Sequence, residues 1–144
     1  MARDHFHSAV RNALIKDGWT ITDDPLRVSY GLSNMEIDLG AENLVAAQKD
    51  LQKIAVEIKS FLGSSALSEF HVALGQCLNY RLALQLVGSD RRLFLAVPHE
   101  AYETFFSQTF AQASLNRNKL SLLIYNPYDE TVVQWIMQPD TETS

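Results

Sequence analysis

Three charged side chains lie among apolar residues in two segments of the chain: Asp38 in "MEIDLG", and Glu57 and Lys59 in "IAVEIKSF". Residues two apart on a β-strand share a face and lie about 6.6 Å apart, because a strand rises roughly 3.3 Å per residue. Glu57 and Lys59 therefore point to one side of a strand whose other side is apolar. Burying either charge unpaired costs several kcal/mol, so we expect a partner or an ion beside them.

A hairpin between these two segments would bring Asp38 towards Glu57 and Lys59. Two carboxylates with nearby strand carbonyls make an oxygen site of the kind that Mg²⁺ prefers, completed by water and phosphate oxygens. Bound Mg²⁺ or Mn²⁺ would lower the pKa of a water and polarise a phosphoryl oxygen, and Lys59 would offset developing charge. The alternative reading is a structural ion pair of Glu57 and Lys59 at a sheet edge.

Hydrophobic periodicity predicts the elements that must position these side chains. Three helices are expected, over residues 5–19, 66–87 and 100–115, and six strands, over 19–22, 33–48, 53–61, 93–97, 119–126 and 131–137. The order αβββαβαββ predicts an α/β (α+β) fold with a mixed central sheet flanked by helices. Residues 1–137 are expected to form a single domain, and residues 138–144 a frayed C-terminal tail.

The pairing of the two central strands decides which carboxylate reaches the site. A connection at residues 49–52 would place Glu42 opposite Lys59, with Asp38 beyond the site. A bend or bulge at Gly40 would bring Asp38 back. Glu42 is therefore an alternative metal ligand to Asp38, and Glu36 is a weaker alternative.

Composition narrows the class of protein. The chain has 144 residues, 47% of them hydrophobic, and a net charge of −5, so it is unlike a protein that coats nucleic acid non-specifically. Arg91, Arg92, Arg117 and Lys119 are read as solvated charges in preference to contacts with a DNA backbone. The single cysteine, Cys77, suits a reducing cytoplasm, and no apolar run approaches the roughly 20 residues of a membrane span.

The charged triplet has a family likeness. Asp38 with Glu57-Ile58-Lys59 resembles the D…(D/E)-x-K signature of the PD-(D/E)XK nuclease superfamily, although no proline precedes Asp38. The resemblance implies a restriction-endonuclease-like core. It further implies that Asp38, Glu57 and the Ile58 carbonyl bind the metal ion and that Lys59 is the catalytic lysine.

A second pattern lies on the long predicted helix. Gln76 and Tyr80 resemble the Q-x-x-x-Y motif of RecB-like members of that superfamily. They are four residues apart and so share a helix face. The resemblance implies a catalytic role for Gln76, near the attacking water or the scissile phosphate, with Tyr80 beside it. The alternative is a polar helix face that meets solvent.

Nearly the whole chain resembles one narrower family. "DHFHSAVRNALIKDGWTITDDPL", "IDLGAE" and "KIAVEIKSFLGSSALSEFHVALGQ" resemble the XisH family, the fdxN element excision controlling factors of cyanobacteria. This implies a role in programmed DNA rearrangement, and the resemblance to the nuclease superfamily adds the expectation of an Mg²⁺-dependent DNA endonuclease. The alternative is a non-catalytic regulatory or docking subunit that assists a site-specific recombinase, with a partner of the XisI type. Whether the protein forms a homo-oligomer is left open.

Overall fold

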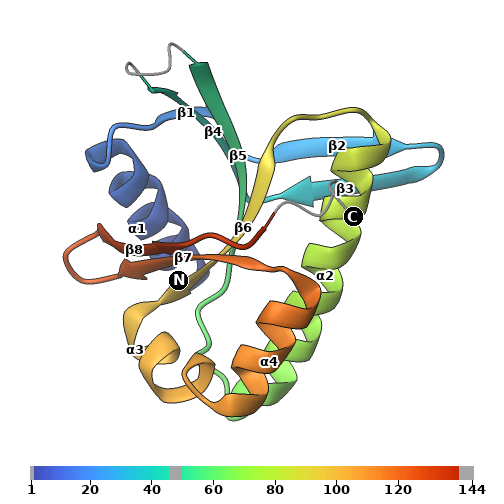
Figure 1. Ribbon diagram of the computed structural model, residues 1–144. Helices are drawn as coiled ribbons and strands as arrows, with labels where there is room; N and C mark the ends of the chain where they lie inside the picture. The colour runs from blue at the N-terminus through green and yellow to red at the C-terminus, as the bar shows by residue number, and fades with distance from the viewer. Residues whose placement is uncertain (1, 46–49, 140–144) are drawn as a thin grey trace.

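The computed structural model describes residues 2–45 and 50–139 (Figure 1). The elements, in chain order, are α1 (Ala2–Lys16), β1 (Thr20–Asp23), β2 (Leu26–Tyr30), β3 (Ser33–Ile37), β4 (Leu39–Val45), β5 (Asp50–Ile58), α2 (Ala66–Leu86), β6 (Arg92–Pro98), α3 (His99–Ala101), the π-helical segment η1 (Tyr102–Phe106), α4 (Thr109–Asn118), β7 (Ser121–Asn126) and β8 (Thr131–Ile136).

A six-stranded mixed sheet in the order β1-β4-β5-β6-β7-β8 forms the centre of the molecule. β5, β6 and β7 run parallel, and the other neighbours in this sheet are antiparallel. Helix α1 lies on one face, and α2 with α4 lies on the other (Figure 1). The expected mixed α/β fold, a sheet flanked by helices, is confirmed.

The segment 33–48, expected as one strand, is divided at Asp38 into β3 and β4. Ile37 packs into the core beneath α2, whereas Leu39 packs into the core beneath α1. In a continuous strand, residues two apart would face the same side. The bend at Asp38 therefore directs Ile37 and Leu39 into different cores. β3 pairs with β2, which the sequence did not predict, in a separate two-stranded sheet.

The expected pairing of the central hairpin is wrong. Glu42 lies opposite Lys53, not Lys59, and Leu39 lies opposite Val56. The reason is that β5 begins at Asp50, three residues earlier than expected, which moves every pair along the hairpin. Residues 50–52 of the expected connection belong to β5 instead. Its first residue, Lys49, lies outside the described residues.

The third expected helix, 100–115, is broken into α3, η1 and α4. The break follows Phe106, where Gln108 takes an extended conformation (φ −69°, ψ 149°). Phe105 and Phe106 are buried against Phe70, with ring centroids 5.6 and 5.5 Å from its ring. Both rings are anchored in the core just before the chain changes direction.

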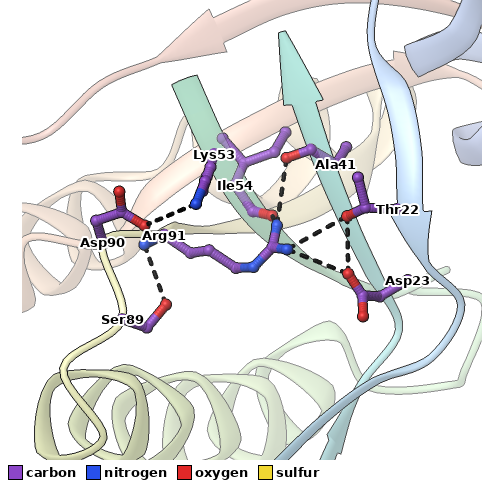
Figure 2. Close-up of polar contacts among 8 residues, drawn as sticks. All are labelled: Thr22, Asp23, Ala41, Lys53, Ile54, Ser89, Asp90 and Arg91. Atoms are coloured by element: carbon purple, nitrogen blue, oxygen red, sulfur yellow. Dashed lines mark hydrogen bonds and ion pairs between the residues drawn. The ribbon is translucent and has the colours of Figure 1, made fainter. Parts of the chain in front are cut away.

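Arg91, expected as a solvated turn charge, is a buried link between four strands (Figure 2). Its side chain is 13% exposed. Nη1 donates to the carbonyls of Ile54 (3.0 Å) and Ala41 (3.4 Å), and Nη2 donates to Asp23 Oδ1 (3.1 Å) and Thr22 Oγ1 (3.3 Å). The guanidinium thus ties the start of β6 to β1, β4 and β5.

Gly40 leaves room for this link. A Cβ at position 40 would lie 3.2 Å from Arg91 Nη1 and 3.1 Å from Asp23 Oδ1, closer than most such contacts.

Near the C-terminus, Gln138 belongs to the structured part and not to a frayed tail. Its N–H donates to Ser121 Oγ (3.0 Å) and its carbonyl accepts from Arg92 Nη1 (3.1 Å).

Across the described ranges, none of the helices combines the length and the apolar character needed to cross a bilayer.

Candidate active site

Asp38 and the C-terminal end of β5 are joined by two hydrogen bonds. The Asp38 N–H donates to Glu57 Oε1 (3.3 Å), and the Ile58 N–H donates to Asp38 Oδ2 (2.8 Å). The bend between β3 and β4 therefore places Asp38 directly beside Glu57. The bend lies at Asp38, two residues before Gly40, and the pairing of β4 with β5 is regular through Gly40.

Lys59 completes this group. Its Nζ lies 3.5 Å from Glu57 Oε2, and its side chain is 25% exposed, against 7% for that of Glu57. The Lys59 N–H donates to the Ala96 carbonyl (3.0 Å), which extends the pairing of β5 with β6 past the end of the strand. The ammonium is therefore held at the mouth of the site, with the carboxylate beneath it.

The electrostatics of the group favour an added cation. Burial, followed by the negative charge of Asp38, raises the pKa of Glu57 from 4.5 to about 7, and Lys59 opposes this rise only in part. Glu57 is thus almost completely buried beside a second carboxylate, with the Lys59 ammonium at 3.5 Å. A divalent cation bound at Glu57 would favour its ionised form.

Helix α2 supplies the facing wall. Gln76 and Tyr80 line the same hollow as Asp38, Glu57 and Lys59, a space of about 410 Å³. Gln76 Oε1 is buried and accepts no hydrogen bond from any described residue. Burial, and next the charge of Glu57, raises the pKa of Tyr80 to about 12. The hollow therefore contains an oxygen that needs a donor or a cation and a hydroxyl that stays protonated.

Glu42 lies away from this group. It is four residues along the chain from Asp38, about 13 Å at the rise of an extended strand, and it does not line the hollow. The pairing on which its candidacy rested is the wrong one. Ile58 does line the hollow, so its carbonyl stays a predicted third ligand.

His7, read from the sequence as a surface histidine, and Asp24 also line the hollow. His7 Nε2 lies 2.7 Å from Asp24 Oδ1, and it must be the donor because a carboxylate only accepts. Arg11, one helical turn after His7, reaches the same carboxylate at 3.6 Å. The i, i+4 spacing of His7 and Arg11 on α1 was the available signal, but their shared partner lies beyond the helix and is visible only in the fold.

The donor set suits a hard divalent cation. In the described part of the chain, no three His, Cys, Asp or Glu side chains come together as a self-sufficient metal site. Mg²⁺ is commonly held by only one or two carboxylates, with water and phosphate oxygens completing its shell. Asp38 and Glu57 meet that requirement, with the Ile58 carbonyl as a further oxygen ligand. Structural zinc, which takes cysteine and histidine, does not fit.

The fold and site together define a class of mixed α/β proteins with a six-stranded central sheet and a buried carboxylate pair, capped by a lysine, at the end of a parallel strand. The family model for the XisH protein matches residues 1–133. The chain belongs to the XisH family.

Two crystal structures are similar to this chain over most of its length. One is of an XisH family protein from Nostoc punctiforme PCC 73102, at 48% identity and a TM-score of 0.84, covering 92% of this chain and 99% of that one. The other is of an fdxN element excision controlling factor protein from Anabaena variabilis, at 50% identity and a TM-score of 0.84, covering 93% and 99%. No curated protein matches the chain.

Proposed function

We propose that this chain is an excision controlling factor that acts in programmed DNA rearrangement by hydrolysing phosphodiester bonds in DNA, with Mg²⁺ or Mn²⁺ as cofactor. The name of the Anabaena variabilis relative supports the first part. The observation that carries the second part is the buried carboxylate pair. Glu57 is 5% exposed beside Asp38, with Lys59 as its one ion-pair partner among the described residues.

Each residue of the site has a distinct task in this proposal. Asp38, Glu57 and the Ile58 carbonyl hold the divalent ion, which polarises the scissile phosphate when bound. The Lys59 ammonium offsets the negative charge that develops on the phosphate oxygens. Gln76 Oε1 accepts a hydrogen bond from the attacking water and so orients it. Tyr80, protonated at neutral pH, donates a hydrogen bond to a phosphate oxygen.

Cleavage of a supercoiled plasmid tests the proposal. Purified protein is expected to nick or cut the DNA with Mg²⁺ or Mn²⁺ and not with EDTA. Lys59→Met is expected to reduce the rate roughly 10²–10³-fold, the usual cost of removing one group that stabilises transition-state charge. Glu57→Gln is expected to abolish cleavage.

Glu42→Gln is the matched control, because it makes the same change on the same sheet outside the hollow. It is expected to leave cleavage intact. Circular dichroism shows whether each variant is folded. Undiminished cleavage by folded Glu57→Gln and Lys59→Met proteins would refute the nuclease assignment.

A second candidate is a non-catalytic subunit that assists a site-specific recombinase together with an XisI-type partner. Its support is the net charge of −5 and four apolar side chains of α2 that are 43–58% exposed: Leu67, Val72, Leu82 and Leu86. An apolar helix surface of this kind is typical of a protein interface. Co-expression with an XisI-type protein is expected to yield a stable complex that Leu82→Lys disrupts, and failure to co-purify contradicts this candidate.

A further inference from the structure

A second hollow lies at the opposite end of the parallel strands from the carboxylate pair. It has a volume of about 250 Å³ and is lined by Arg81 of α2, Arg92 at the start of β6, Lys119 at the end of α4 and Ser121 at the start of β7. Arg92 pairs with Ile54, near the middle of β5, whereas Glu57 lies at the end of β5, so the two sites lie at different points along the parallel strands. The second hollow is called the basic hollow below.

Main-chain carbonyls hold the two arginines of the basic hollow in place. Arg81 Nη1 donates to the carbonyl of Lys119 (2.8 Å) and Nη2 to that of Asn118 (2.7 Å), which covers the C-terminal end of α4. Arg92 Nη1 donates to the carbonyl of Gln138 (3.1 Å). These acceptors are neutral and use only part of the five N–H donors of each guanidinium, so no described residue neutralises either positive charge.

The charge of the basic hollow opposes that of the whole chain. In the described structure, Arg81, Arg92 and Lys119 make no ion pair with a carboxylate, and the acidic residue in the lining, Asp90, faces Lys53 at 3.9 Å. Burial lowers the pKa of Arg81, which means that its charge is poorly solvated. A cluster of fixed cations in a chain of net charge −5 attracts a compact anion.

The wall of the basic hollow is rigid. Arg91, also in the lining, is fixed by its four acceptors on β1, β4 and β5 (Figure 2). Lys119 lies in the left-handed region with φ 51° and ψ 46°, which non-glycine residues rarely adopt. The guanidinium groups of Arg81, Arg91 and Arg92 are therefore positioned before any ligand arrives, which lowers the entropic cost of binding.

We propose that the basic hollow binds a phosphate group. Guanidinium groups match the oxygens of phosphate with paired hydrogen bonds, and the lysine adds a point charge. The volume holds a phosphate together with several waters, since each water occupies about 30 Å³ in the liquid. This site takes an anion, whereas the carboxylate site takes a cation, so the two assignments are independent.

Calorimetric titration of the metal-free full chain with inorganic phosphate tests the proposal, with ionic strength held constant by sodium chloride. Saturable binding at one site is expected. Arg92→Gln is expected to weaken it roughly tenfold, the loss that accompanies one hydrogen bond to a charged group. Lys119→Gly is expected to weaken it similarly while raising the melting temperature, because glycine adopts φ 51° without penalty. A weakened but more stable variant excludes misfolding as the cause.

Arg117→Gln is the matched control, since this exposed arginine lies on α4 two residues before Lys119 and does not line the basic hollow. It is expected to bind phosphate as the unmodified protein does. Absence of saturable binding overturns the proposal. So does an Arg117→Gln effect equal to that of Lys119→Gly, which would reflect overall charge.

A short DNA duplex in the same metal-free buffer separates two sources of the phosphate group. If the duplex competes with inorganic phosphate, the basic hollow accepts a backbone phosphate of DNA. If the duplex does not compete, the hollow accepts a free phosphate. Both results support a phosphate site.

Discussion

The buried carboxylate at position 57 makes the stability of the protein depend on pH, and Glu57→Gln removes that dependence. Burial and the neighbouring Asp38 raise the pKa of Glu57 from 4.5 to about 7. The folded protein therefore binds a proton more tightly than the unfolded chain does. The contribution of this proton to stability is complete below about pH 4.5 and is lost as the pH rises through about 7. At 1.36 kcal/mol per pKa unit, the rise corresponds to about 3 kcal/mol.

Glutamine has the shape of protonated glutamate and never ionises. Glu57→Gln is therefore expected to match the unmodified protein in free energy of unfolding at pH 4, and to exceed it by about 3 kcal/mol at pH 8.5. Urea denaturation of both proteins from pH 4 to pH 8.5 measures this difference. Glu42→Gln, on the same sheet, serves as the control and is expected to show no such divergence.

The same pair of proteins tests the cation. Mg²⁺ at pH 8.5 is expected to raise the stability of the unmodified protein, because a ligand that binds only the folded state stabilises it. It is expected to have little effect on Glu57→Gln. If the free energies of unfolding of the two proteins change with pH in the same way, the pKa of Glu57 is not raised in the folded state, and the reasoning is refuted.

Two further substitutions have expected outcomes. Gln76→Leu removes a buried oxygen that has no hydrogen-bond partner among the described residues. Thermal stability is expected to stay unchanged or rise, while the rate of plasmid cleavage falls. A loss of stability would show that Oε1 has a structural role. Arg91→Ala removes a donor from Asp23 and from two strand carbonyls and is expected to cost about 2–3 kcal/mol in urea denaturation. Arg27→Ala, which breaks an exposed ion pair with Glu36, is expected to cost under about 1 kcal/mol. Equal costs would contradict the assigned role of Arg91.

Alternation along strands was enough to predict that Glu57 and Lys59 share a face. A hairpin was expected to bring Asp38 towards them, but the expected pairing left Asp38 beyond the site unless the chain bent or bulged at Gly40. Alternation could not place the hairpin itself. The pairing depends on where β5 begins, and a shift of the start to Asp50 carries Glu42 to Lys53. The bend at Asp38 was also hidden, because Ile37 and Leu39 look like one apolar face and are divided between two cores only in the folded molecule.

Other contacts join residues that no local pattern connects. Asp24 receives hydrogen bonds or ion pairs from His7 and Arg11 on α1, so these members of the site depend on how the helix docks. Arg91 bonds to carbonyls 37 and 50 residues away, and a main-chain carbonyl leaves no trace in the amino-acid sequence. The sequence thus indicated the chemistry of the central carboxylates, while the walls of both hollows follow from tertiary packing.

The central claim is that Asp38 and Glu57 bind a divalent cation beside Lys59. An anomalous difference map from a crystal of this protein soaked in Mn²⁺ tests it most directly. We expect one strong peak between the two carboxylates, within about 2.0–2.3 Å of oxygens from both. A map without a peak there, from a crystal in which both side chains are well ordered, would contradict the account.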